Sequence, residues 1–141
     1  MTISAYIPGT PRPQPRVKAY SRGGHAGVYT PDTADAWKQE IALAMREYAG
    51  VAIAGPIWLT MSFYIPRPKS HYGTGKNARV LKPQSPKFHT NRGDVDNFCK
   101  GAMDCLTTCQ VWKDDAQVVS LKAEKFWADD APGMALMIMT K

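Results

Sequence analysis

Residues 57–65 have the sequence IWLTMSFYI, in which strongly apolar side chains occupy every second position. Because successive side chains of a β-strand point to opposite faces, this alternation predicts a strand with one continuous core face. Pro66 and Pro68 follow directly and would end the strand, because proline cannot donate to a sheet ladder. We therefore expect this strand to form the centre of the fold.

The segment before this strand has the pattern of an amphipathic helix. Asp32 or Thr33 can cap its start, and Gly50 can end it. Apolar side chains recur between these points at three- and four-residue spacing, which is typical of one buried helical face. The residues of that face are Trp37, Ile41, Ala44, Met45 and Tyr48.

The other elements follow from the same reasoning. They are a strand over 2–7, a loop or ragged hairpin over 8–31, a long loop over 66–93, a helix from about Asp96 to Cys109, and strands over about 116–127 and 134–140. The order is β-α-β-α-β-β, and neither a repeat nor a second domain is visible. We expect one α/β domain of α+β-like character over residues 1–141, with a mixed sheet and two main helices.

The distribution of charge favours a polyanionic partner. The chain has 18 Lys and Arg against 12 Asp and Glu, a formal charge of +6, yet residues 1–31 and 48–93 contain no acid. Each Lys or Arg set against a phosphate releases condensed counterions, so we prefer DNA binding over a merely solvated basic surface. In the long loop, the expected DNA-binding residues are Arg67, Lys69, Lys76, Arg79 and Arg92.

Several other classes of protein lack support. No apolar run approaches the roughly 20 residues of a membrane-spanning helix, and the N-terminal residues do not form a secretory signal, so we expect a cytoplasmic protein. The three cysteines, Cys99, Cys105 and Cys109, lack zinc-site spacing and fit small buried thiols. A calcium loop beginning at Asp94 would need glycine at the position of Cys99.

The chemistry concentrates in residues 92–100, RGDVDNFCK. Asp94 and Asp96 stand two positions apart at a loop-to-helix junction, where extended backbone can point both carboxylates the same way. Lys100 lies one helical turn beyond Asp96, away from the apolar face. The three groups can therefore converge at the surface.

A second acidic pair, Asp114 and Asp115, could bring a third carboxylate to the same site. Carboxylates about 4 Å apart repel by roughly 4 kcal/mol at a surface-like dielectric, so the cluster would need a proton or a cation. Oxygen ligands suit Mg²⁺, with Mn²⁺ as an alternative. The pattern favours metal-assisted phosphodiester hydrolysis with Lys100 stabilising the transition state. The simpler interpretation is an Asp96–Lys100 surface ion pair or an Asp96 N-cap.

Three segments, which follow one another in this order along the chain, carry a family resemblance: DVDNFCK at 94–100, MDCL at 103–106 and VWKDDAQVV at 111–119. They resemble the D-x-D-N-x-x-K, D-A-L and W-x-D-D-A-Q-V signature of the RusA family of Holliday junction resolvases. Cys105 stands where that pattern usually has alanine, a small-for-small change. The loop over 66–92 is longer than in compact members of the family.

The resemblance implies a small mixed α/β subunit and assigns roles by matching position. The implied catalytic residues are Asp94, Asp96, Lys100 and Asp115, and the implied metal ligands are Asp94, Asp96 and Asp115, with Asp114 as an accessory candidate. It further implies a Mg²⁺-dependent homodimer with two active sites, which makes paired symmetric nicks in four-way junctions during DNA recombination and repair.

Two other functions stay open on the sequence. A nuclease acting on flaps or replication forks would use the same metal site. A non-catalytic protein that binds branched DNA would carry the acids as structural residues. Metal-dependent strand scission that disappears in Asp94→Asn, with binding retained, would identify a nuclease.

Overall fold

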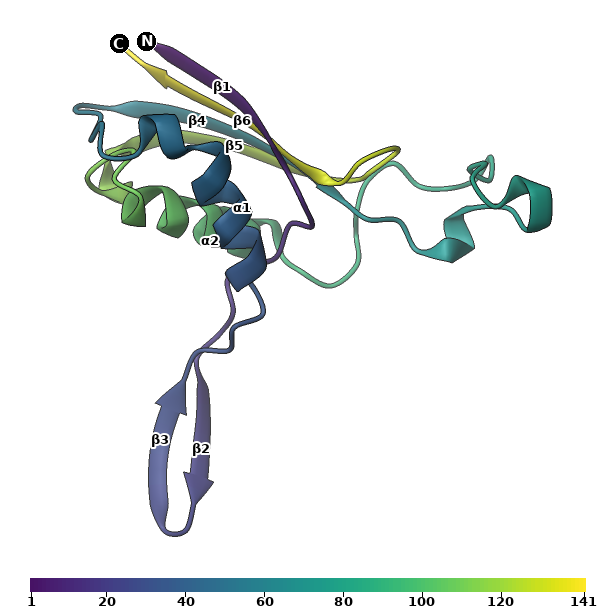
Figure 1. Ribbon diagram of the computed structural model, residues 1–141, viewed down its shortest axis with the longest axis horizontal. Coiled ribbons are helices and arrows are strands. Elements are labelled where there is room, and N and C mark those ends of the chain that lie inside the picture. Colours follow the sequence, from purple (N-terminus) through teal and green to yellow (C-terminus); the bar gives the residue numbers. More distant parts are fainter.

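A four-stranded sheet in the spatial order β1-β6-β4-β5 carries two helices on one of its faces (Figure 1). The computed structural model describes residues 1–141. The strands are β1 (Thr2–Pro8), β4 (Ile57–Ile65), β5 (Val118–Trp127) and β6 (Gly133–Thr140), and the helices are α1 (Asp35–Ala44) and α2 (Val95–Thr108). The expected α+β class, with a mixed sheet and two main helices, is confirmed.

The strand at β4 has the predicted alternation. Ile57, Leu59, Met61 and Phe63 are each 2% exposed or less and pack into the core beneath the helices. The side chains between them are half-buried and lie on the opposite face of the sheet. β4 pairs antiparallel with β6 and parallel with β5, so it occupies an interior position in the sheet.

Because β4 and β5 run parallel, a crossover must join them, and residues 66–117 supply it with α2 as its helical part. α2 therefore runs back along the sheet, opposite to the direction of β5. Its N-terminal end lies beside Lys125, near the end of β5, where the lysine Nζ donates to the Gly93 carbonyl. Its C-terminal end lies beside Asp115, just before β5 begins, where Thr107 donates to the aspartate.

The helices fill the space over the sheet with the residues that their apolar spacing predicted. α1 contributes Trp37 and Ile41, and α2 contributes Phe98, Ala102 and Leu106, all at most 3% exposed. The first helix is shorter than expected, because it stops at Ala44 and a 3₁₀ turn over Arg46–Tyr48 follows. The strand expected from about residue 116 begins later, at Val118, where β5 starts. The residues before it, Asp115–Gln117, form a 3₁₀ turn, η4. No helix is both long and apolar enough to cross a membrane.

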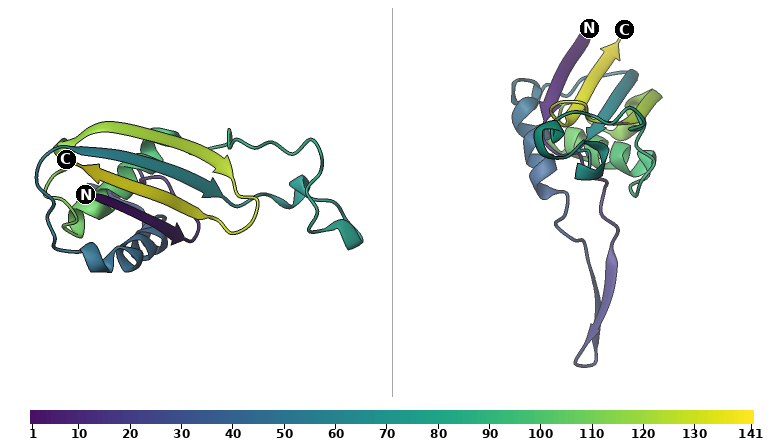
Figure 2. Two further views of the ribbon diagram at one scale, coloured as in Figure 1. Left: turned by 90° about the horizontal axis from the view of Figure 1, so that it is seen from above. Right: turned by 90° about the vertical axis from the view of Figure 1, so that its right-hand side faces the viewer.

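Two arms project from the sheet and its helices in different directions (Figures 1 and 2). The first is a hairpin of β2 (Lys18–Arg22) and β3 (His25–Tyr29), which resolves the expected loop or ragged hairpin as a hairpin. The second is the predicted long loop, residues 66–93, which contains the 3₁₀ turns η2 (Lys69–His71) and η3 (Gly75–Asn77). Both arms coincide with the acid-free stretches of the chain.

Candidate active site

Asp94 and Asp96 lie at the N-terminal end of α2 with exposed side chains. Asp94 holds the N-cap position, yet its carboxylate makes no capping hydrogen bond. One oxygen of Asp96 accepts from the Asn97 N–H at 3.0 Å, so Asp96 is not the N-cap. The chain has three ion pairs and neither carboxylate belongs to them, so no Asp96–Lys100 pair forms. Both simpler interpretations of Asp96 are therefore excluded.

The turn before α2 is shaped by one glycine and one lysine. Gly93 has φ +112°, and a Cβ at this position would lie 2.7 Å from the Phe98 ring. Residues with a side chain rarely adopt this backbone conformation, and a side chain would also collide with Phe98, so the position requires glycine. Lys125 reaches over from β5 and its Nζ donates to the Gly93 carbonyl at 2.5 Å, with the Phe98 ring 6.0 Å away. The turn that presents Asp94 is thus held by the core on one side and by β5 on the other.

One surface ridge of α2 connects the candidate residues. Asp96, Lys100, Met103 and Thr107 follow one another at spacings of four, three and four, which places them on one side of a helix. Asp96 and Lys100 are exposed and the other two are half-buried. We call these four residues the α2 stripe. Lys100 therefore lies on the same side as Asp96, as the sequence predicted.

Asp115 lies at the opposite end of this stripe and is held by two donors. The Trp112 indole N–H donates to its Oδ1 at 3.1 Å, and the Thr107 hydroxyl donates to the same oxygen. Trp112 also donates to the Thr107 hydroxyl at 2.7 Å and is itself fully buried. Asp115 is exposed, and its carboxylate is oriented by the buried Trp112 and the half-buried Thr107.

Asp114, the neighbouring acid, has a structural partner. Its carboxylate accepts from the Ala116 N–H at 2.8 Å, and Gln117 completes a capping box by accepting from the backbone N–H of Asp114 at 3.0 Å. The Gln117 amide also donates to the carbonyl of Ile53 at 2.8 Å. These bonds fix the η4 turn and thereby the position of Asp115, its first residue.

The acids at the two ends of α2 do not meet within one chain. Thr107, the partner of Asp115, lies eleven residues beyond Asp96, about 16 Å at the helical rise of about 1.5 Å per residue. No three His, Cys, Asp or Glu side chains of the chain are close enough to hold a metal ion together. The expectation that Asp94, Asp96 and Asp115 converge in a single subunit is therefore wrong, because α2 runs back along β5 and separates them.

Comparison with known proteins decides the family. Residues 8–139 match the family model described as Endodeoxyribonuclease RusA. The chain belongs to the RusA family. It is also 32% identical over 142 residues to the protein named "Uncharacterized protein YqaN" of Bacillus subtilis (strain 168), a match that covers 96% of this chain and 94% of that protein.

Membership of the RusA family makes this protein an endodeoxyribonuclease that resolves crossover junctions, with branched DNA as its substrate class. Nucleases of the family generally depend on a divalent metal. The donor set fits such a metal, because Asp94 and Asp96 offer exposed carboxylate oxygens that no Lys or Arg neutralises, and hard cations prefer oxygen ligands.

In this RusA-family chain, the basic residues of the long loop fall into two groups. Lys69, Lys76, Arg79 and Arg92 are exposed. The side chain of Arg67, in contrast, is only 3% exposed and donates to Asp129 at 2.7 Å, to the Pro86 carbonyl at 2.7 Å and to the Ala128 carbonyl at 3.0 Å. Arg67 therefore holds the loop to the β5–β6 turn, a role that differs from the DNA contact expected from its charge.

The cysteines are the buried thiols that the helical pattern predicted. Cys99 and Cys105 are at most 6% exposed, and Cys109 is half-buried. Burial raises the pKa of the Cys99 thiol to about 11 and that of Cys105 to about 12, so both remain protonated near neutral pH. They therefore pack as small apolar groups in this RusA-family fold.

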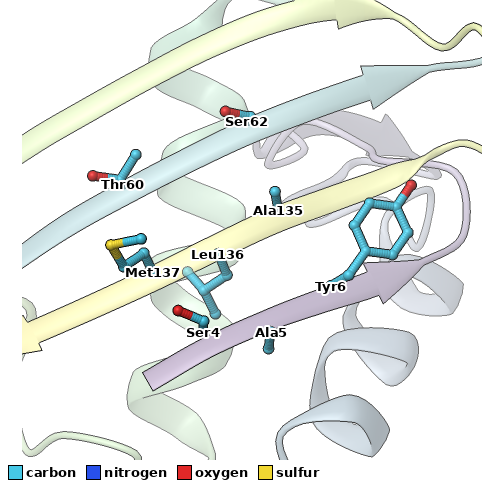
Figure 3. A pocket seen from close by; sticks show the side chains of 8 residues that line it. All are labelled: Ser4, Ala5, Tyr6, Thr60, Ser62, Ala135, Leu136 and Met137. Carbon is cyan, nitrogen blue, oxygen red and sulfur yellow. The ribbon is translucent and has the colours of Figure 1, made fainter. Parts of the chain in front are cut away.

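The face of the sheet that the helices leave uncovered carries a shallow hollow of about 450 Å³ (Figure 3). It is lined by Ser4 and Tyr6 of β1, Thr60 and Ser62 of β4, and Ala135 and Met137 of β6, with their neighbours in the strands. None of the candidate acids lines this hollow. The α2 stripe, on the helical side of the sheet, is therefore the candidate site for the chemistry of the RusA family.

Sequence reasoning missed the residues that support the acids. These residues, each in contact with one end of α2, are Thr107, Gly93 and Lys125. Only Thr107 could have been predicted, because its spacing of eleven residues from Asp96 places both on one face of a helix. Trp112 belongs to the segment 111–119 that resembles the family signature, and the structure shows that its indole N–H donates to Asp115 in the same segment.

Proposed function

We propose that this chain resolves four-way DNA junctions as a homodimer, and that each active site combines Asp94 and Asp96 of one chain with Asp115 of its partner. The observation that carries the proposal is that acids lie at both ends of the α2 stripe. Asp94 and Asp96 lie at its N-terminal end, and Asp115 contacts Thr107 at its C-terminal end. Mg²⁺ bound there would activate water and neutralise charge that develops on the phosphate.

A two-fold axis supplies the arrangement that one chain lacks. Two copies of α2 that pack antiparallel bring the N-terminal end of each helix to the C-terminal end of the other, and an isologous interface creates both contacts at once. Lys100 and Met103 stand at the middle of the stripe, where the axis would pass. Leu121, which pairs with the buried Leu59 and shares its face of the sheet, is 47% exposed on the edge strand β5. It is available to an interface that packs on this side of the sheet.

The residues of the chain would then have separate tasks. Asp94 and Asp96 offer oxygens that no ion pair occupies, and Asp115 offers an oxygen that Trp112 and Thr107 orient. Lys100, one turn from Asp96, would stabilise the charge of the pentavalent phosphate. A symmetric dimer presents two such sites, which suits nicks on two strands of a four-way junction.

Mixed dimers test both the activity and the sharing of the site. Asp96→Asn and Asp115→Asn chains should each fail to nick an end-labelled four-way junction in Mg²⁺. When the two are mixed and allowed to exchange subunits, the heterodimer has one site with both acids replaced and one fully intact site. We expect single nicks to reappear on a denaturing gel, only with Mg²⁺ and not with EDTA.

The matched control is a mixture of Asp94→Asn with Asp96→Asn. Both substitutions then affect the same half of every site, so no intact site forms and no nicks should return. If wild-type protein nicks junctions but the first mixture does not, the shared site is wrong and the acids must meet in another way. If wild-type protein binds junctions and never nicks them, the chain is a non-catalytic binder of branched DNA.

A further inference from the structure

The β2–β3 ribbon, residues 18–29, is an exposed arm with no core of its own. Nine of its ten strand residues are exposed, and no other element packs on it (Figures 1 and 2). An isolated two-stranded hairpin is at best marginally stable in water, because it buries little apolar surface. The ribbon therefore contributes little to the stability of the fold, and its side chains are available to a partner.

The two faces of the ribbon differ in chemistry. Side chains alternate between the faces along each strand, and residues that are paired across the ladder share a face. The pairs Lys18 with Tyr29, Tyr20 with Gly27 and Arg22 with His25 place one set together. We call this set the cationic face: Lys18, Tyr20, Arg22, His25 and Tyr29. The opposite face has only small or apolar side chains, those of Ala19, Ser21, Ala26 and Val28.

Glycines give the ribbon its shape. Gly23 and Gly24 form a two-residue turn with φ +56° and +80°, a combination whose twist matches that of a hairpin. Gly27 leaves room for the Tyr20 side chain, since a Cβ there would lie 2.6 Å from the tyrosine hydroxyl oxygen. The Tyr20 and Tyr29 ring centroids are 6.2 Å apart, so both aromatic rings lie along the cationic face.

The base of the ribbon is attached to the helix that carries the candidate acids. The Gln14 N–H donates to the Asn97 carbonyl at 2.9 Å, directly after Asp96. The buried Gly101, next to Lys100, allows this close approach, because a Cβ there would lie 3.3 Å from the Gln14 nitrogen. The segment that leads into the ribbon is therefore anchored beside the N-terminal part of α2.

We propose that the ribbon grips a duplex arm of the DNA substrate through its cationic face, an inference that rests on the proposed function. The major groove of duplex DNA, about 12 Å wide, admits a two-stranded β-ribbon. Five strand residues span about 17 Å, the length of roughly five base pairs. Residues 1–31 contain no acid, so nothing on this arm repels phosphate. Lys18 and Arg22 contact phosphates, and the tyrosine hydroxyls supply further hydrogen bonds.

The test measures the salt dependence of binding in an Asp96→Asn background, in which DNA is bound without being cut. The variant Lys18→Ala/Arg22→Ala is compared on a linear duplex, a four-way junction and a single strand of the same sequence. The loss of two phosphate contacts should reduce the log–log salt slope for duplex and junction by about two, and weaken binding by up to about sixtyfold at about 0.1 M salt. The single strand should lose less.

The matched control is Arg46→Ala/Lys122→Ala, which removes the same charge from two exposed side chains outside both arms. Its salt slope should equal that of the Asp96→Asn protein, and thermal melts should show that both double variants remain folded. An unchanged slope in the ribbon variant, or an equal loss on the single strand, would overturn the duplex grip. Because binding is measured without cleavage, failure of wild-type protein to nick junctions would count against the proposed function and leave this result standing.

Discussion

Carboxylates lie at both ends of α2, but the residues that surround them differ. At the N-terminal end, Asp94 and Asp96 are exposed and without ion-pair partners, and the turn beneath them depends on Gly93 and Lys125. At the C-terminal end, Asp115 is oriented by two donors that rest on the core. The difference indicates that one end is free to adapt to a ligand, while the other presents a fixed oxygen. A RusA-family dimer would bring the two kinds of end together.

The largest expected effect comes from removing a charge at either end. Asp94→Asn, Asp96→Asn and Asp115→Asn should each lower the rate of junction cleavage by about a thousandfold or more, because metal stabilisation of the transition state is worth several kcal/mol. Binding should stay intact or become tighter, since a negative charge near phosphate is removed. The measurement is nicking of an end-labelled junction beside a gel-shift titration.

Asp104 offers the control for these substitutions, because it is exposed on the same helix and pairs with Lys38 at 3.0 Å. Asp104→Asn should cleave at the wild-type rate. A loss of junction binding in all three active-site variants would instead mean that the acids are structural, and the difference between the two ends would have no catalytic meaning.

A smaller effect should separate the fixed end from the free end. Thr107→Val removes a hydroxyl that donates to Asp115, and a hydrogen bond to a charged group contributes about 1.5–3 kcal/mol. We expect cleavage to fall by about ten- to a hundredfold and the Mg²⁺ concentration for half-maximal activity to rise. Thr107→Ser keeps the hydroxyl and should remain near wild type. Equal rates in the valine and serine variants would show that Asp115 needs no orientation by Thr107.

The turn at the free end can be disturbed through its backbone. Gly93→Ala would force a side chain onto φ +112° and place its Cβ 2.7 Å from the Phe98 ring, at a cost of about 1–3 kcal/mol. The melting temperature should fall by several degrees. Gly50→Ala is the control, because Gly50 has φ +79° with open space around it. A drop no larger than that of the control would mean that the Phe98 contact relaxes easily.

The smallest effect concerns pH. His89 is 6% exposed, and the centroid of its ring lies 6.5 Å from that of Phe98 in the first turns of α2. Burial, followed by the positive charge of Lys125, lowers the pKa of His89 below 6.5. A histidine with a lowered pKa binds a proton more readily when unfolded, so its contribution to stability is complete above pH 6.5 and declines as the pH falls toward the folded pKa. The free energy of unfolding should decrease from pH 7 to 5. His89→Phe should flatten this dependence, and an unchanged slope would assign it to other groups.

Local pattern was sufficient for most of the fold. The alternation in residues 57–65 and the apolar spacing in both helices correctly predicted β4, α1 and α2, because burial of one face imposes a period on the sequence. The prediction was less accurate at the ends of elements, where the conformation of a turn decides which residue is the last or the first. The first helix ended early at Ala44, and Asp115–Gln117 formed a 3₁₀ turn in place of the start of a strand.

The sequence by itself determined which residues are candidates for the chemistry. They are two aspartates and a lysine at helical spacing, a second acidic pair, and basic stretches without acids. Only the tertiary structure decided how they lie. The parallel pairing of β4 and β5 turns α2 back along the sheet, which places the acids at opposite ends of one helix. It also placed Arg67 in an internal ion pair and left the β2–β3 ribbon free. Charge and spacing are local properties of a sequence, whereas the partner of each charge depends on which distant segments the sheet brings together.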